Sequence, residues 1–107
     1  MSNGAPTIKA AARMQSPAHP GTILRELYLK PLGITLAEAA EALGVTPNHV
    51  SGIVNGHARI TADMAIRLAV ALDTETQLWV HLQAQHDLWT ASQSPPTNGK
   101  RLRQAAA

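Results

Sequence analysis

The 107-residue sequence predicts an all-α fold, and three observations support that prediction. Hydrophobic residues make up 45% of the chain, yet phenylalanine is absent and aromatic residues reach only 3%. A core built from alanine, leucine, isoleucine and valine favours short, closely packed helices over a sheet. Apolar residues recur at helical spacing between polar connections, and no stretch alternates in the way that a strand requires. We therefore expect one domain of five short helices.

The first two helices are predicted from their start and stop signals. His19-Pro20-Gly21 places a proline at about the first position of a helix, and Lys30-Pro31 is expected to end it. Thr35-Leu36-Ala37-Glu38 has the form of a capping box, in which a hydroxyl and a carboxylate each satisfy a free backbone N–H group. Gly44 can adopt the left-handed conformation that ends the second helix.

A third helix is expected from Pro47 to about Asn55. Thr46 is its N-cap, and a proline is favoured at the first helical position that follows. Asn55-Gly56 is expected to end the helix because both residues tolerate positive φ. Three branched apolar residues are expected to face inward, and they are Val50, Ile53 and Val54.

The last two helices also begin at threonine-containing signals. Thr61 is the expected N-cap of the fourth helix, and Thr74-Glu75-Thr76-Gln77 is a second capping-box pattern that opens the fifth. Residues of the fifth helix that cluster within about 100° on a helical wheel form one face. They are Leu78, Trp79, Leu82, His86 and Trp89.

The second and third predicted helices are separated only by Gly44-Val45-Thr46. Two helices joined by a short turn that contains glycine are typical of a helix-turn-helix motif. Ala39 and Ala40 supply the small residues that the crossing of the two helices requires. The spacing therefore predicts a helix-turn-helix whose second helix begins at Pro47.

The two ends of the chain differ in composition from its middle. Residues 1–17 are small, polar and aperiodic, and residues 92–107 contain Pro95-Pro96 and a basic cluster. Such composition is typical of disorder. We expect a folded domain over residues 18–91, between a disordered N-terminal arm and a disordered, basic C-terminal tail.

The formal net charge of +2 is unevenly distributed along the sequence. Between Ala18 and Ala91 the chain carries four basic and seven acidic residues, a net charge of −3. The other five cations lie in the two ends, and they are Lys9, Arg13, Lys100, Arg101 and Arg103. The chain's basic character alone therefore does not indicate a nucleic-acid-binding domain.

The sequence lacks the signals that mark several functional classes. Cysteine is absent, no apolar run reaches 18 residues, and the N-terminus has no charged start followed by an apolar segment. We therefore expect a soluble, cytoplasmic protein without membrane association. His81 and His86 are five residues apart rather than four, and no catalytic triad, paired carboxylate or phosphate-binding glycine loop is apparent. We expect no metal ion, no cofactor and no enzymatic activity.

The stretch from His19 to Leu88, about two-thirds of the chain, resembles the HigA/VapI-type antitoxins, a branch of the Xre/Cro-like helix-turn-helix proteins. The resemblance is carried by "HPGTIL", "KPLGIT", "SGIVNG", "ARITADMAIRLA" and "LWVHLQ", which occur in this order. It implies a five-helix fold and a homodimer that binds a palindromic operator in its own promoter. It also implies neutralisation of a HigB-type toxin, an mRNA endonuclease related to RelE.

The third helix supplies the candidate DNA-reading residues, because the N-terminal end of this helix enters the major groove in a helix-turn-helix. The Asn48 amide can both donate to and accept from the edge of adenine, and His49 can donate to guanine. Gly52 permits close approach to the groove. The exposed set on the helical wheel is Thr46, Asn48, His49, Ser51, Gly52 and Asn55.

Phosphate contacts are expected from hydroxyl groups and from one arginine. Thr46 and Ser51 are candidates, and Thr35 has the same position at the start of the other motif helix. Arg59 is the best-placed cation of the domain. Structural roles remain open for Thr46 as an N-cap and Asn55 as a C-cap. His49, His57 and Ala58 stand where the resembled family often carries basic residues.

The domain has few cations to bind DNA phosphates, and dimerisation and the chain ends are two ways to compensate for the low affinity that results. Val80 and Leu88 lie off the main stripe of the fifth helix, so we expect a subunit contact there, and Trp79 and Trp89 are candidates for core or dimer contacts. The five terminal cations can act as arms on the DNA backbone or in the minor groove.

Two alternative functions remain: a stand-alone repressor without a toxin, and a toxin-binding scaffold with weak or lost DNA binding.

Overall fold

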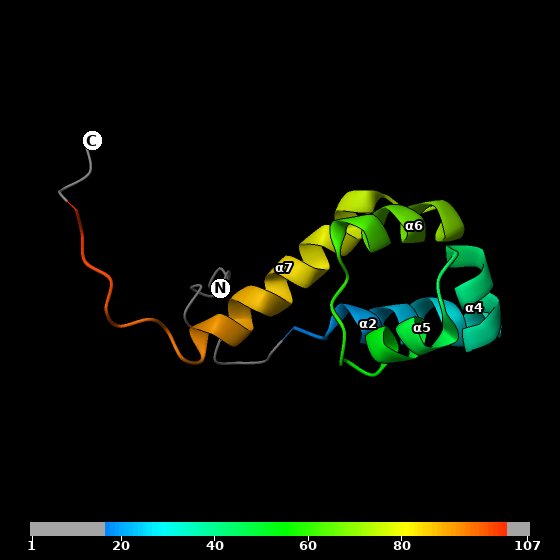
Figure 1. The fold of residues 1–107 in the computed structure, drawn as a ribbon, viewed down its shortest axis with the longest axis horizontal. Coiled ribbons are helices and arrows are strands. Elements are labelled where there is room, and N and C mark those ends of the chain that lie inside the picture. Colours follow the sequence, from blue (N-terminus) through cyan, green and yellow to red (C-terminus); the bar gives the residue numbers. More distant parts are fainter. Residues whose placement is uncertain (1–16, 103–107) are drawn as a thin grey trace, which may run out of the picture.

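The computed structural model describes residues 17–102, and every regular element within them is a helix (Figure 1). Three segments of the first helical rod follow one another without a break, so five rods result and the all-α expectation is confirmed. The elements are α2 (Pro20–Ile23), η1 (Leu24–Leu29), α3 (Lys30–Leu32), α4 (Leu36–Leu43), α5 (Pro47–Val54), α6 (Ala62–Leu72) and α7 (Thr76–Ser92).

The first rod runs through Pro31, so the predicted stop at Lys30-Pro31 is wrong. The segment η1 is a π-helix, in which the Lys30 N–H donates to the carbonyl of Arg25, five residues earlier. Pro31 is the second residue of the short α3 turn, a position that requires no backbone N–H donor. The rod ends instead at Gly33, which has a left-handed φ of 66°.

The helix-turn-helix is formed by α4 and α5, and its predicted caps are confirmed. Thr35 Oγ1 accepts from the Glu38 N–H at 3.1 Å, and Glu38 Oε1 accepts from the Thr35 N–H at 2.9 Å. Gly44 ends α4 with a φ of 71°. Thr46 Oγ1 accepts from the His49 N–H at 3.1 Å, and the first residue of α5 is Pro47.

The end of α5 at Asn55-Gly56 is confirmed. Asn55 is the C-cap with a φ of −94°, and of the two residues that tolerate positive φ, Gly56 adopts it, with a φ of 80°. A single left-handed residue is enough to turn the chain, and glycine adopts this conformation without the steric cost that a Cβ atom adds.

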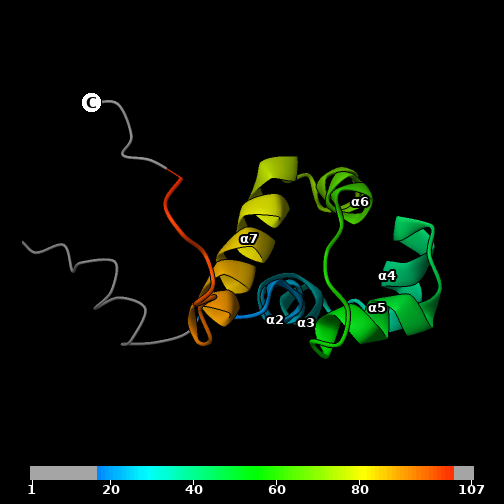
Figure 2. The same ribbon diagram turned by 60° about the vertical axis from the view of Figure 1, so that its left-hand side comes forward.

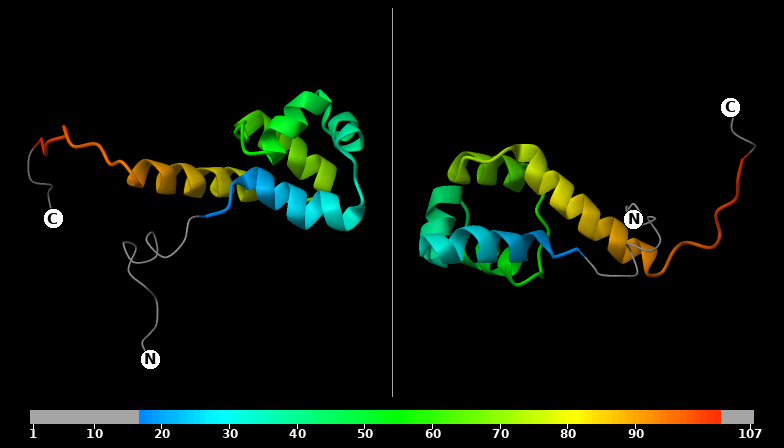
Figure 3. Two further views of the ribbon diagram at one scale, coloured as in Figure 1. Left: turned by 90° about the horizontal axis from the view of Figure 1, so that it is seen from below. Right: turned by 180° about the vertical axis from the view of Figure 1, so that it is seen from behind.

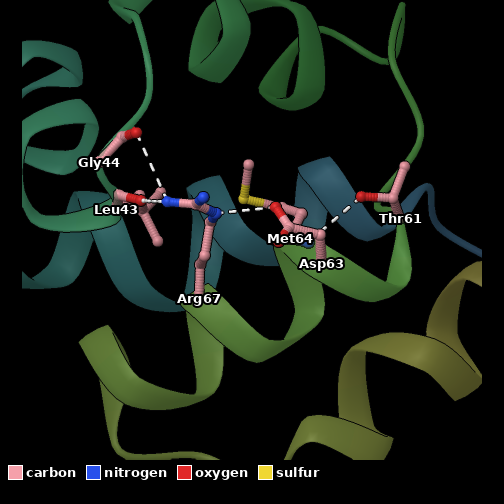
Figure 4. Close-up of polar contacts among 6 residues, drawn as sticks. All are labelled: Leu43, Gly44, Thr61, Asp63, Met64 and Arg67. Carbon is pink, nitrogen blue, oxygen red and sulfur yellow. Dashed lines mark hydrogen bonds and ion pairs between the residues drawn. The ribbon is translucent and has the colours of Figure 1, made fainter.

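Arg67 of α6 fastens the helix-turn-helix turn to the rest of the domain (Figure 4). Its Nη1 donates to the carbonyls of Leu43 at 2.8 Å and Gly44 at 3.5 Å, and its Nε donates to Asp63 Oδ2 at 2.8 Å. The last carbonyls of a helix lack intrahelical partners, so a guanidinium group there satisfies them. We call Arg67, Asp63 and the two carbonyls the Arg67 clamp. Thr61, the confirmed N-cap of α6, accepts from the Met64 N–H at 3.2 Å.

The capping box predicted at the start of α7 is wrong. Glu75 is the N-cap and makes no capping hydrogen bond with its side chain. Thr74 Oγ1 instead accepts from Trp79 Nε1 at 2.8 Å. Because the Trp79 side chain is fully buried, its indole N–H needs a partner inside the protein, and Thr74 provides it.

The core lies where α2, η1, α4, α5 and α6 meet the first half of α7 (Figure 2). Gly21 lets α2 approach α5 closely, because a Cβ atom on this residue would overlap the carbonyl of Ile53. The second half of α7 extends beyond the other helices (Figure 3). The largest fully buried side chains are Trp79, Leu24, Ile53, Met64, Leu68, Val50 and Pro20.

Candidate nucleic-acid interface

One side of α5 packs into the core and the other side carries polar residues. Val50, Ile53 and Val54 are at most 4% exposed, as predicted. The opposite side presents residues at the spacing i, i+3, i+4 and i+7, which places them on one helical face. We call these four the recognition stripe: Asn48 and Asn55, which are exposed, and Ser51 and Gly52, which are half-buried.

The amide of Asn48 has no partner among residues 17–102, whereas the other end of the stripe is internally linked. Asn55 Nδ2 donates to Ser51 Oγ at 3.2 Å, which leaves the Ser51 hydroxyl proton available to an acceptor. His49 is exposed beside the stripe. A polar surface of amide, hydroxyl and imidazole groups can donate and accept hydrogen bonds in several directions.

Thr35 and Thr46 are both exposed N-caps at the starts of the two motif helices. In each cap the hydroxyl oxygen accepts a backbone N–H, and the hydroxyl proton is not used in that bond. A capping threonine can therefore still donate to an anion near the helix N-terminus, where the peptide dipoles favour negative charge. The structural and DNA-contacting interpretations of these residues are compatible.

Gly52 is not required by the fold at its position. A Cβ atom there would meet the Ala58 Cβ at 3.5 Å, an ordinary van der Waals distance. The backbone of Gly52 is helical, and glycine is unfavourable in a helix by about 0.8–1.0 kcal/mol relative to alanine. Packing within the domain therefore does not explain the glycine, which leaves the close approach of a binding partner as its explanation.

All four basic residues of the helical domain are paired with carboxylates. Arg25 and Lys30 share Glu26 at 3.0 Å each, and Arg67 belongs to the clamp. Arg25 also donates to the carbonyl of Val54 at 3.3 Å, at the end of α5. The fourth, Arg59, lies in the loop between α5 and α6, and its Nη2 contacts Asp87 Oδ2 at 2.8 Å.

A buried glutamine connects this loop to α7. Gln83 is only 4% exposed, and its Oε1 accepts from the Ile60 N–H at 2.7 Å. Its Nε2 donates to Asp87 Oδ1 at 2.9 Å, and the hydrogen bond from Arg59 holds the pKa of the Asp87 carboxyl below its usual value. We call Arg59, Gln83 and Asp87 the loop network. Gln83 and Asp87 were not predicted as functional, although a polar i, i+4 pair beside an apolar helix face is a detectable signal.

Two histidines meet where α2 begins beside α7. The His19 and His86 rings are 4.9 Å apart between centroids in an edge-on arrangement, and His19 Nδ1 accepts from the Gly21 N–H at 2.9 Å. Partial burial, followed by the nearby His86, lowers the pKa of His19, which favours the neutral ring that this N-cap requires. His86 Nδ1 is buried without a hydrogen-bond partner among the described residues.

The outer face of α7 carries an apolar stripe. Val80 and Leu88 are 42% and 72% exposed, and Ala84 lies between them at the same i, i+4 spacing. Trp79 is a core residue, which decides between the two roles left open for it, and Trp89 is half-buried with its carbonyl accepting from Ser92 Oγ at 2.7 Å. This apolar stripe of α7 therefore faces solvent beside the loop network.

Lys100 and Arg101 are exposed, whereas Lys9, Arg13 and Arg103 lie outside the described residues. Within residues 17–102, no group of three potential metal ligands comes together. The same part of the chain has no helix that is long and apolar enough to cross a membrane.

The fold and the exposed face of α5 define a helix-turn-helix domain of the Xre type. Residues 24–79 match the Helix-turn-helix protein family. The HTH-type transcriptional regulator YbaQ of Escherichia coli K12 is 44% identical over 82 residues, which cover 77% of this chain and 71% of that protein. Antitoxin HigA-1 of Vibrio cholerae is 42% identical over 73 residues, covering 68% and 69%.

A solved structure of the Pseudomonas aeruginosa antitoxin HigA with the higBA promoter superposes with a TM-score of 0.71 at 44% identity. The match covers 73% of this chain and 85% of that one. The chain belongs to the HigA-like branch of the helix-turn-helix family, which confirms the resemblance found in its motifs.

Proposed function

We propose that this protein is a dimeric antitoxin that represses its own promoter and neutralises a HigB-type mRNA endonuclease. The observation that carries the DNA-binding half is the recognition stripe, an uncharged polar face on the second helix of a helix-turn-helix. Support also comes from the homologous HigA, whose structure contains promoter DNA. The activity we propose for the chain is binding, with no catalytic step, metal ion or cofactor, in the cytoplasm.

In this proposal Asn48 reads adenine and His49 contacts guanine in the major groove. Ser51 and Asn55 extend the contact along the stripe, and Gly52 lets the helix approach the bases closely. Thr35 and Thr46 donate their free hydroxyl protons to phosphates, and Arg59 adds a charged contact. The chain ends, which carry Lys100 and Arg101 among other cations, contribute further phosphate affinity as arms.

The homodimer is proposed to form through the outer face of α7. Val80 and Leu88 are exposed at helical spacing with small Ala84 between them, which suits a close helix contact, and Trp89 lies at its edge. A two-fold related pair that binds a palindromic operator needs its recognition helices about 34 Å apart, the spacing of adjacent major grooves.

Binding to the protein's own promoter is tested with a gel shift on the DNA upstream of its gene. Wild-type protein is expected to retard this duplex in the presence of excess unrelated competitor, and Asn48→Ala is expected to lose the discrimination. Glu41→Gln, an exposed change on α4, is the matched control. Equal retardation of both duplexes by the wild type would contradict operator recognition.

Toxin binding is tested by co-purification with the product of a neighbouring small, basic reading frame. The expected result is a stable complex and relief of growth inhibition when both proteins are expressed. If the two proteins elute separately and growth is not restored, the antitoxin half is wrong. The second candidate, a toxin-binding scaffold with weak DNA binding, is favoured by one observation: all four cations of the helical domain are already paired.

A further inference from the structure

We propose that Asp87 of α7 limits the affinity of this protein for DNA by competing with the phosphate backbone for Arg59. The inference rests on the proposed DNA-binding function and deepens it. It assigns an affinity-setting role to a residue that belongs to neither motif helix. Asp87 acts through Arg59 and does not itself touch the DNA.

Arg59 is the one lysine or arginine in the loop over residues 55–61, which directly follows the recognition helix. Its side chain is 59% exposed and that of Asp87 is 40% exposed, so the ion pair faces solvent and a phosphate can approach it. Only Nη2 of the guanidinium group is bonded to the carboxylate. A phosphate oxygen and Asp87 Oδ2 are the same kind of acceptor, and both seek the same donors.

A second hydrogen bond, from Gln83, holds the Asp87 carboxylate in place. Gln83 is buried, and it bonds to both the Ile60 backbone and Asp87 Oδ1. Because the carboxylate is fixed to α7 in this way, it cannot follow Arg59 toward a DNA backbone. Arg59 either stays with Asp87 or leaves it for the phosphate.

The other three cations of the helical domain have different surroundings. Arg25 and Arg67 donate to backbone carbonyls at helix ends, so moving them would leave those carbonyls unsatisfied. Lys30 pairs with Glu26 on the first rod. The Arg59 side chain makes no bond to the backbone among the described residues, so a carboxylate alone restrains it. The same holds for Lys30, but only Arg59 lies in the loop that follows the recognition helix.

The test is Asp87→Asn, which keeps an Oδ1 acceptor for Gln83 and removes the charge that holds Arg59. The expected gain in DNA affinity is about two- to fivefold per bound chain, the range of an exposed ion pair. The slope of log K against log salt should steepen by up to about 0.9, the value for one fully neutralised phosphate, because Asp87 no longer competes for Arg59. Fluorescence anisotropy between about 50 and 200 mM salt measures both quantities.

Two further variants separate the mechanism from a general charge effect. In an Arg59→Gln background, Asp87→Asn should produce no gain. Glu41→Gln makes the same change of charge on α4, away from any ion pair in residues 17–102, and should leave the slope unchanged. A thermal melt compares the folded state of each variant. Asp87→Ser, which also removes the carboxylate, is measured in parallel in case Asp87→Asn is unstable.

The proposal is overturned if both Asp87 variants bind DNA as the wild type does or more weakly, or if the gain persists without Arg59. Each protein is measured on the upstream duplex and on a scrambled duplex of equal length. If wild type does not distinguish them, the proposed operator recognition fails. The scrambled duplex still tests Asp87, because phosphate contacts carry no sequence information.

Discussion

The Arg67 clamp at the turn of the helix-turn-helix and the recognition stripe on its second helix use polar groups in different ways. In the clamp, Arg67 satisfies the carbonyls at the end of α4 and a carboxylate on its own helix. On the stripe, Asn48 is exposed and unpartnered within residues 17–102. The comparison teaches that charge maintains the shape of this motif, whereas uncharged groups remain available to a partner.

The largest expected effect is loss of the clamp. Arg67→Met retains much of the side-chain volume but removes the bonds to the α4 carbonyls, and hydrogen bonds to charged groups contribute about 1.5–3 kcal/mol each. We expect a loss of about 2 kcal/mol in the free energy of unfolding, measured by urea denaturation. Arg67→Lys should recover only part of this loss because an ammonium lacks the fork geometry. Unchanged stability in the methionine variant would mean that the clamp does not support the turn.

The next effect should appear only in binding. Asn48→Ala removes the proposed contact with adenine, and a good bidentate contact discriminates between bases by about 1–3 kcal/mol. We expect roughly a tenfold weaker affinity for the upstream duplex, with the free energy of unfolding within about 0.5 kcal/mol of wild type, as is usual for surface changes. A variant that binds normally would remove Asn48 from the interface.

Gly52→Ala should change stability and binding in opposite directions. The added methyl group has room beside Ala58 and improves helix propensity, so unfolding should cost up to about 0.8 kcal/mol more. The same methyl group enters the space between α5 and the groove, so affinity for the upstream duplex should fall. Gln77→Ala, at an exposed position of α7 outside the recognition stripe, is the control. If Gly52→Ala binds as tightly as wild type, close approach at this residue is not needed.

The smallest effect concerns pH. Because burial lowers the pKa of His19 in the folded state, the unfolded chain binds the proton more readily. Stability therefore falls as the pH drops below the ordinary histidine pKa of about 6.5, until the lower folded pKa is passed. His19→Asn keeps an acceptor for the Gly21 N–H without titrating in this range. The melting temperature is measured at pH 7.5 and at pH 5.5, and the difference between the two should be smaller in this variant than in wild type. An equal difference in both proteins would exclude His19 as a source of the pH dependence.

Local signals predicted most of the fold. The capping box at Thr35 and the caps at Thr46 and Thr61 depend on residues within three positions, and the structure confirms them. The failed predictions involve tertiary or unusual backbone contacts. Thr74 bonds to the Trp79 indole instead of capping α7, and the π-helical segment carries the first rod past Pro31. Capping and proline rules describe neighbouring residues, so they do not anticipate either arrangement.

The candidate site was predicted less completely. The exposed positions of α5 follow from the burial of Val50, Ile53 and Val54, and the structure places the predicted residues on the opposite side. Arg59 was identified as a cation, but its pairing with Asp87 spans 28 residues and depends on how α7 crosses the loop. No spacing rule in the sequence connects the two residues, so the extent to which Arg59 is restrained became visible only in the fold.

The pairing of every cation in the helical domain also bears on how the protein searches a genome. Affinity for random DNA comes mainly from unneutralised positive charge, and a genome offers about 10⁶–10⁹ competing sites. In the proposed function, the net negative helical domain adds little to this non-specific affinity, which is left to the cations of the chain ends. Fewer molecules are then held on random DNA by the domain itself, so a repressor made in small numbers can still occupy its operator.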